Sequence, residues 1–447
     1  MKARRHILQA ALRSVQVVAL LLLSSCVKLE AERQVDGPAA VSFDAYLSRG
    51  VVTRSGFSGE LGNADLQSEG FGVFGYHTVN ATYNAAGLPD FMYNTKVDNP
   101  SGSAWTYSPV KYWPNQDTED AVDRVSFFAY APYVDVNPDS GAPSGGDDAT
   151  TGITWLSRFT DAGDPLVGYR TTFAPSSCVD LCWGSPRVDV RRPTVAQKVD
   201  FTFRHALSAL NVQVDAAVDE LAPGENALDG DTRIYVRSIT FEGFATKGAL
   251  NLNSPGIVPI WEDYSAKGTL ERTPVTIHDG RLDGLEARYD DPGETPAALH
   301  PDIVQQGTYN AKPGVTNATV NLFGGTQTWA PVYVIPNGYP LKVTIVYDVE
   351  TRDDKLLTSY LSDGMTHGSV TRVSIVKPIA TSQLGPIRLE AGKKYFLRLH
   401  LGMTSVKFAA EIAVSDQWSE DVHPIEFQVV TMAQDVDNTE ANNGFWS

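Results

Sequence analysis

The chain has 447 residues, of which 42% are hydrophobic and 10% aromatic, so it holds ample apolar side chains for packed cores. Its formal net charge is −17 at pH 7. A surface this acidic argues against nucleic acid as a partner and against attraction to anionic lipid headgroups.

The first 25 residues have the pattern of a bacterial export signal. Lys2, Arg4, Arg5 and Arg13 form a basic start without an acidic residue, and residues 15–23 are apolar apart from Gln16. This apolar run is too short to cross a bilayer, which takes about twenty residues. The pattern predicts a cleaved signal peptide over residues 1–25.

Small residues stand directly before the first cysteine, in Leu23-Ser24-Ser25-Cys26. This order resembles the bacterial lipobox, in which the cysteine thiol takes a diacylglycerol and becomes the new N-terminus. A plain signal peptide with a chance cysteine is the alternative. Removal of the signal leaves 422 residues with a net charge of −21, enough for about two or three domains. We expect contact with the membrane through this lipid anchor only.

Short alternating or aromatic-rich runs dominate the rest of the chain. Residues 26–37 are polar and predict a tether, and Val41, Phe43, Ala45 and Leu47 then mark one face of a strand. Further strands are expected at 71–76, 91–97, 105–112 and 125–130. Residues 199–214 form one long run, with alternating ends and a middle that is bulged or briefly helical.

A second set of strands follows the acidic, Pro- and Gly-containing segment 216–231. These strands are expected at 234–244, 249–253, 319–323, 331–335, 341–350 and 395–414. Helical periodicity is nearly absent. The sequence therefore predicts an all-β fold of two tandem β-sandwich domains, residues 38–220 and 221–447, with the boundary near the acidic segment.

The sequence motifs that match cofactor or metal sites by their letters each lack a feature that such a site requires. The Gly70-Phe-Gly72-Val-Phe-Gly75 run lies inside a strand-like segment, whereas a dinucleotide site needs a strand before it and a helix after it. A calcium loop beginning at Asp435 fails because Glu440 stands where glycine is required. His205 lies in an apolar strand and fits a hydrogen-bonded core residue. We predict no enzymatic activity, no cofactor and no metal site.

Cys178 and Cys182 are the cysteines that remain after lipidation of Cys26. An oxidising compartment permits a short-loop disulfide between them, and two thiols are an equal alternative. Their spacing is not Cys-x-x-Cys and no paired histidines lie nearby in the sequence, so neither a redox site nor a zinc site is predicted.

Several motifs resemble those of one family when they are taken in order. Trp105-Thr-Tyr107-Ser-Pro-Val-Lys111-Tyr112-Trp113-Pro114, followed by Val125-Ser-Phe127-Phe128-Ala129-Tyr130-Ala131-Pro132-Tyr133, is similar to the signature of the fimbrillin-like lipoproteins of Gram-negative anaerobes. The further matching motifs are Thr53-Arg54-Ser55, Phe71-Gly-Val73-Phe74-Gly-Tyr76, Phe91-Met92-Tyr-Asn94, Phe203-Arg-His205-Ala206-Leu207-Ser208, Val332-Tyr333-Val334-Ile335-Pro336, Gly392-Lys-Lys-Tyr395, Leu399-His-Leu401-Gly402-Met403-Thr404-Ser405-Val406 and Trp418. The resemblance runs from about residue 41 to residue 418.

The resemblance implies two transthyretin-like β-sandwich domains and export as a lipoprotein. In stalk members it also implies that a surface protease cuts behind an arginine and removes the first strand, whose groove then accepts a strand of the next subunit. Here Val41, Phe43, Ala45 and Leu47 are the candidate exchanged strand. Arg49 and Arg54 are the candidate cut sites, with ordinary loop arginines as the alternative.

The end of the chain offers a candidate donor strand within residues 424–431. Ile425, Phe427 and Val429 alternate with polar residues, as a strand entering a groove would. An ordinary final edge strand has the same pattern.

The predicted function is that of a fimbrial structural subunit or a tip or anchor adhesin, at the outer membrane and cell surface. Its partners would be other fimbrial subunits, in a homo- or hetero-polymer, and a host protein or glycan. The alternative is a surface glycan-binding lipoprotein in which Trp105, Tyr107, Tyr112 and Trp113 stack on sugar rings. The same four aromatic residues fit a sandwich core.

Overall fold

The computed structural model describes residues 38–47, 61–114, 122–144, 151–216, 232–265, 270, 273–279, 320–321, 331–361, 367–381, 385–401 and 409–415. Strands make up most of the secondary structure in these residues, together with one short α-helix and one 3-10 turn (η1, Pro175–Ser177). The all-β prediction is confirmed.

The first sheet contains the strand nearest the N-terminus. Its order is β1 (Phe43–Leu47), β9 (Val199–His205), β7 (Cys182–Gly184), β4 (Asp123–Ala131), β2 (Phe71–Val79) and β3 (Met92–Val97), and β8 (Arg187–Val190) also pairs with β4. The β1–β9 pair is parallel, and the other pairs in this sheet are antiparallel. Helix α2 (Asn63–Glu69) leads into β2 through Gly70, whose φ of +78° suits glycine.

Three further sheets and a short strand pair complete the described fold. One sheet has the order β14 (Ile260–Glu262), β13 (Lys247–Asn251), β6 (Leu166–Arg170) and β5 (Gly152–Leu156). Another has β12 (Phe244–Ala245), β17 (Val332–Pro336), β10 (Ser208–Ala216), β22 (Lys394–Leu401) and β23 (Ala409–Ser415), with β16 (Val320–Asn321) on β10. The third has β15 (Val275–Asp279), β11 (Thr232–Glu242), β18 (Lys342–Arg352) and β19 (Gly368–Pro378), and β20 (Ala380–Thr381) pairs with β21 (Gly385–Pro386).

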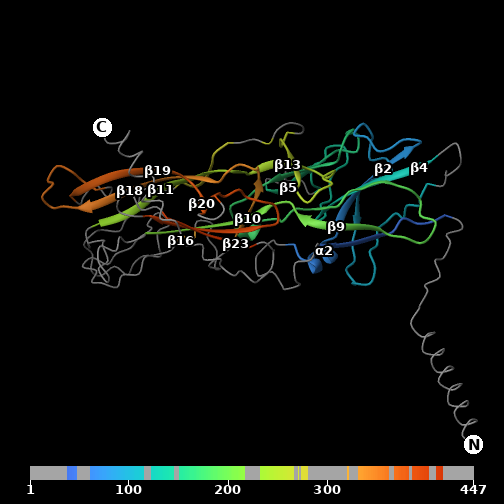
Figure 1. Cartoon of the computed structure of the whole chain (residues 1–447), viewed down its shortest axis with the longest axis horizontal. Coiled ribbons are helices and arrows are strands. Elements are labelled where there is room, and N and C mark those ends of the chain that lie inside the picture. The colour runs from blue at the N-terminus through green and yellow to red at the C-terminus, as the bar shows by residue number, and fades with distance from the viewer. Residues whose placement is uncertain are drawn as a thin grey trace, which may run out of the picture.

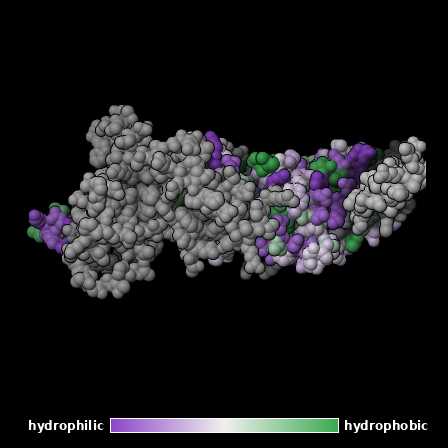
Figure 2. Space-filling model, turned by 60° about the horizontal axis from the view of Figure 1, so that its bottom comes forward, coloured by the Kyte–Doolittle hydropathy of each residue, from purple (hydrophilic) through white to green (hydrophobic). Residues whose placement is uncertain are grey.

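The sheets follow one another along an elongated molecule (Figure 1). Strands β2, β4 and β9 lie toward one end, and β11, β18 and β19 lie toward the other. Strand β10 lies between these two groups. On the face shown in Figure 2, hydrophobic residues occur singly or in small groups among hydrophilic ones over the described surface.

The central strands β2 and β4 of the first sheet are buried on both faces over most of their length, which explains why they are almost continuously apolar. Along β4, Val125, Phe127 and Ala129 belong to one hydrophobic cluster, whereas Phe128 and Tyr130 belong to another. This is the period of two expected for a strand. The first cluster also receives β1, and the second extends through residues 74 to 397 across the other sheets.

Some expected elements differ from those observed. The strand expected at 105–112 is wrong: Thr106 and Tyr112 make only isolated bridges, to Asp98 and Ala40. The runs 199–214 and 395–414 each form two strands, and the first divides at Ala206 and Leu207 so that β9 and β10 enter different sheets. The glycines of residues 70–75 lie at the start of β2 and within it.

The division into domains at residues 38–220 and 221–447 stays a prediction, and strand pairing crosses it. Strand β10 precedes the boundary yet pairs with β17 and β22. Strand β13 follows the boundary yet pairs with β6. Two tandem sandwiches would therefore have to exchange strands with each other.

Candidate functional site

Strand β1 forms the edge of the first sheet. It runs parallel to β9, with pairs from Phe43 with Val199 to Leu47 with Phe203. The Val199 amide also donates a hydrogen bond to the Ser42 carbonyl oxygen at 2.8 Å. Within the described ranges, no other strand forms a ladder with β1, so this strand can leave without dividing the sheet.

The side chains of β1 alternate between the core and the solvent. Val41, Phe43 and Leu47 are buried and Ala45 is partly buried against the same cluster. Tyr46, on the opposite face, is 50% exposed. The four residues of the candidate exchanged strand therefore share the inner face.

Phe43 fills the centre of an aromatic slot, which we call the β1 slot. Its ring lies 5.4 Å from Tyr107, 5.7 Å from Phe127, 6.0 Å from Phe201 and 6.4 Å from Phe71, between centroids. Most of these contacts are edge-to-face, an arrangement that stabilises aromatic pairs beyond the area they bury. Without β1, this slot would open an apolar surface to water.

The segment 105–114, which forms no ladder strand, holds the chain just before β1. The Tyr107 hydroxyl donates to the Val41 carbonyl oxygen at 2.8 Å, and the Val41 amide donates to the Lys111 carbonyl oxygen at 2.9 Å. Burial raises the pKa of the Tyr107 hydroxyl, which strengthens its hold on the proton that it donates. At the far end of the strand, the Leu47 amide donates to the Asn63 side chain at 2.9 Å.

The four aromatic residues considered for sugar stacking differ in how far they are exposed to solvent. Trp113 is buried, and Trp105 and Tyr107 are partly buried against the core that holds β1. Tyr112 alone points outward, with 55% of its surface exposed. Three of the four therefore pack in the β1 slot or against the core beside it.

In the structure, Cys178 and Cys182 are buried free thiols and do not form a disulfide. Their surroundings differ. The Cys178 sulfur lies 3.5 Å from the carbonyl oxygens of Thr172 and Ala174, and burial raises its pKa to about 11. The Cys182 sulfur lies 3.4 Å from the Nδ1 atom of His205.

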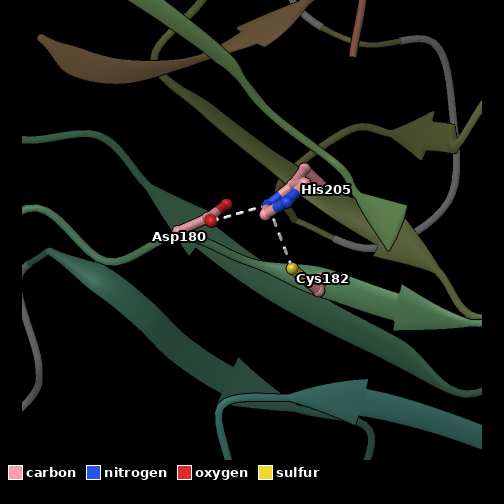
Figure 3. A group of neighbouring side chains, drawn as sticks. All are labelled: Asp180, Cys182 and His205. Atoms are coloured by element: carbon pink, nitrogen blue, oxygen red, sulfur yellow. Dashed lines mark hydrogen bonds and ion pairs between the residues drawn. The ribbon is translucent and has the colours of Figure 1, made fainter. Parts of the chain in front are cut away.

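Asp180, Cys182 and His205 form a compact polar cluster (Figure 3). The antiparallel β7–β9 register pairs Cys182 with His205, and Asp180 stands two residues before Cys182. Oδ2 of Asp180 lies 2.7 Å from Nδ1 of His205. The Asp180 carboxylate and the Cys182 thiol both point toward the imidazole. His205 is hydrogen-bonded, as expected from its apolar strand, but the chain spacing gave no sign of its two partners.

This cluster does not have the geometry of a nucleophilic triad. In such a triad the carboxylate and the nucleophile contact opposite nitrogens of the imidazole. Here the Asp180 carboxylate and the Cys182 sulfur both approach Nδ1. A carboxylate at this nitrogen cannot orient the ring for proton transfer at the other nitrogen to this thiol.

The family model described as fimbrillin-like matches residues 60–414. The chain belongs to the fimbrillin-like family. Among solved structures it is similar to a fimbrial protein from Bacteroides vulgatus, at 21% identity over 86% of this chain and 100% of that chain, with a TM-score of 0.49. It is also similar to a candidate cell adhesion protein from Bacteroides uniformis, at 13% identity over 86% of this chain and 100% of that chain, with a TM-score of 0.38. No curated protein matches it significantly.

This fimbrillin-like chain has a cationic hollow that its overall charge gave no reason to expect. A cavity of about 480 Å³ lies beside β9, and Trp113 forms one wall. Four basic side chains line it: Arg187, Arg191, Arg192 and Lys198. Lys198 also contacts Asp44 of β1 at 3.2 Å, but this pair is exposed and contributes little to stability.

Several predicted site residues of the fimbrillin-like chain lie outside the described residues. These are Cys26, Arg49, Arg54, Ile425, Phe427 and Val429. Among the residues that are described, no helix is both long enough and apolar enough to span a membrane.

Proposed function

We propose that this chain is a lipoprotein subunit or adhesin of a fimbria and that it assembles by β-strand exchange. In this proposal the signal peptide directs export and Cys26 carries the lipid at the outer membrane and cell surface. Cleavage behind Arg49 or Arg54 then releases β1, and a strand from another fimbrial subunit takes its place. Family membership supports the fimbrial role.

The β1 slot is the observation that carries this proposal. The strand lies at a sheet edge and is held by one ladder, and residues 41–47 put three buried apolar side chains into the core. Burial of each large apolar side chain stabilises a protein by about 1.5–3 kcal/mol. A vacated slot would offer the same stabilisation to an incoming strand, and the free edge of β9 would offer backbone hydrogen bonds.

The proposed occupant is the segment 424–431 of another copy or of a related subunit. Ile425, Phe427 and Val429 would enter the positions that the inner face of β1 leaves. A shift of one residue would turn them to solvent, so the alternation would fix the register.

The test is controlled proteolysis of the purified chain behind Arg49 or Arg54. We expect ladders that survive SDS, because a strand inserted into the slot dissociates slowly, and we expect Phe427→Asp to prevent them by placing a charge in an apolar slot. Gln428→Asp is the matched control, since it adds the same charge on the opposite face. Cleavage should be verified from the new N-terminus.

A peptide with the sequence of residues 41–47 provides a second arm of this experiment. It should block ladder formation by refilling the slot, whereas the same peptide with Phe43→Asp should not. Cleaved protein that stays monomeric at high concentration would contradict strand exchange. Ladders that persist with Phe427→Asp would retain the polymer and reject this donor.

The glycan-binding alternative receives no support from the aromatic residues proposed for it. Trp105, Tyr107 and Trp113 pack at the core that holds β1, which leaves Tyr112 alone on the surface. A stacking platform normally needs a ring face turned to the ligand.

A further inference from the structure

The Asp180–Cys182–His205 cluster contains one thiol, one imidazole and one carboxylate. Each residue offers one ligand atom, and these atoms all lie within 4.8 Å of one another. Thiolate, imidazole and carboxylate are the three ligand types that proteins use for zinc. The cross-strand register of β7 and β9 holds two of the three residues in place.

Asp180 is the residue that most requires a further partner. Its side chain is fully buried, and Oδ2 accepts the Leu61 amide at 3.1 Å in addition to its contact with His205. No hydrogen-bond donor in the described part of the chain reaches Oδ1. A buried carboxylate oxygen without a partner is costly, and a cation would remove this cost.

The distances in the cluster suit a small cation. Zinc bonds of about 2.0–2.3 Å at tetrahedral angles place ligand atoms roughly 3.3–3.7 Å apart. The Cys182 sulfur and His205 Nδ1 are already 3.4 Å apart. The 2.7 Å contact of Asp180 Oδ2 with Nδ1 would be lost when Nδ1 binds the metal. Ligation through Oδ1 would leave Oδ2 on the Leu61 amide, which orients the carboxylate.

The charges also balance. A divalent cation, one thiolate, one carboxylate and a neutral imidazole sum to zero, which limits the cost of burying them. On binding, the Cys182 thiol proton leaves to solvent. The Nδ1 proton of His205 either moves to Nε2 or leaves, so that the Nδ1 lone pair can bind the metal.

We propose that Asp180, Cys182 and His205 bind one Zn²⁺, with water in the fourth position. The ion would join β7 to β9 next to Leu61, where the described chain resumes after the segment holding Arg49 and Arg54. This site is independent of the strand exchange proposed above.

The test is a metal titration of the full chain carrying Cys26→Ser, so that Cys178 and Cys182 are its only thiols. After reduction and removal of metal with a chelator, Co²⁺ should bind at one per chain and give a thiolate-to-cobalt charge-transfer band. Zn²⁺ should abolish this band and raise the thermal midpoint. Native mass spectrometry of the same protein gives the stoichiometry independently.

Two matched pairs of variants assign the ligands. Cys182→Ser should abolish the charge-transfer band and weaken binding at least about 100-fold, whereas Cys178→Ser, at the other buried thiol, should keep both. His205→Gln should also weaken binding, whereas His77→Gln, at the comparable His77–Asp123 pair, should not.

The titration of the Cys26→Ser chain decides the matter even where a variant does not fold. Failure of the reduced protein to bind stoichiometric Co²⁺ or Zn²⁺ would overturn the site. Binding that survives both Cys182→Ser and His205→Gln would overturn it equally.

Discussion

Burial controls the chemistry of the Cys178 thiol. Its pKa rises from 9.0 to about 11 because the thiolate would be desolvated in the core. In the unfolded chain the thiol loses its proton at lower pH than in the folded chain. The stabilisation that the protonated Cys178 thiol contributes to the free energy of unfolding is therefore complete below pH 9. It is lost as the pH rises toward 11.

We accordingly expect the free energy of unfolding to fall between pH 9 and pH 11 by more in the unaltered chain than in Cys178→Ala. The difference should be at most about 2.7 kcal/mol, from two pKa units at about 1.36 kcal/mol each. Urea unfolding at several pH values measures it. The comparison with Cys178→Ala is essential, because burial also raises the pKa values of Tyr93 and Tyr133 to about 12. Parallel pH profiles for the two proteins would contradict this account.

The neighbours of His205 show where reasoning from sequence stops at the residue scale. The sequence predicts a hydrogen-bonded core histidine, and the structure agrees. Asp180 and Cys182 lie more than twenty positions earlier, however, and only the β7–β9 register brings them to the same nitrogen. A spacing rule for metal ligands cannot detect a cluster made by cross-strand pairing.

Among the elements, β1 is the one most clearly visible in the sequence. Its alternation predicts the face that is buried, because residues at every second position share a side of the sheet. The strand expected at 105–112 fails because an aromatic-rich extended segment and a ladder strand have the same composition. Tyr107 and Lys111 use their polar groups to hold the chain around Val41 instead of pairing in a ladder.

Truncation of Phe43 tests how strongly β1 is held. Phe43→Ala removes the ring at the centre of the slot, and we expect a loss of about 3–5 kcal/mol in the free energy of unfolding. Tyr46→Ala, on the exposed face of the same strand, should cost about 1 kcal/mol or less, since it loses mainly the hydrogen bond from Thr202. Urea denaturation compares them. Equal losses would show that the slot contributes little.

Within the described residues, one large hydrophobic cluster includes side chains from all four larger sheets. It contains Phe128 of the first sheet, Leu250 of β13 and Ile345 of β18. Since strands also pair across residue 220, the predicted domain division does not coincide with a division of the core. Sequence patterns locate strands, but they do not state which strands pair, and that choice depends on contacts between distant residues.

We expect the described fold to unfold in a single calorimetric transition. Phe128→Ala and Ile345→Ala, at buried positions on either side of residue 220, should both lower the midpoint of that one transition, because each creates a cavity in the shared cluster. Two peaks, with each substitution moving a different one, would instead support independent domains at 38–220 and 221–447.

The pairing of β10 with β22 has a consequence for how the chain is made. Ala209 pairs with Lys394, about 185 residues later. At roughly 5–20 residues per second, the ribosome adds that length in about 10–40 s. Throughout this time the emerging β10 has no β22 beside it and exposes a strand edge that other nascent chains could join. The sheet that contains β10 can therefore be completed only after β22 has been made. We expect the nascent chain to depend on chaperones that keep this edge covered.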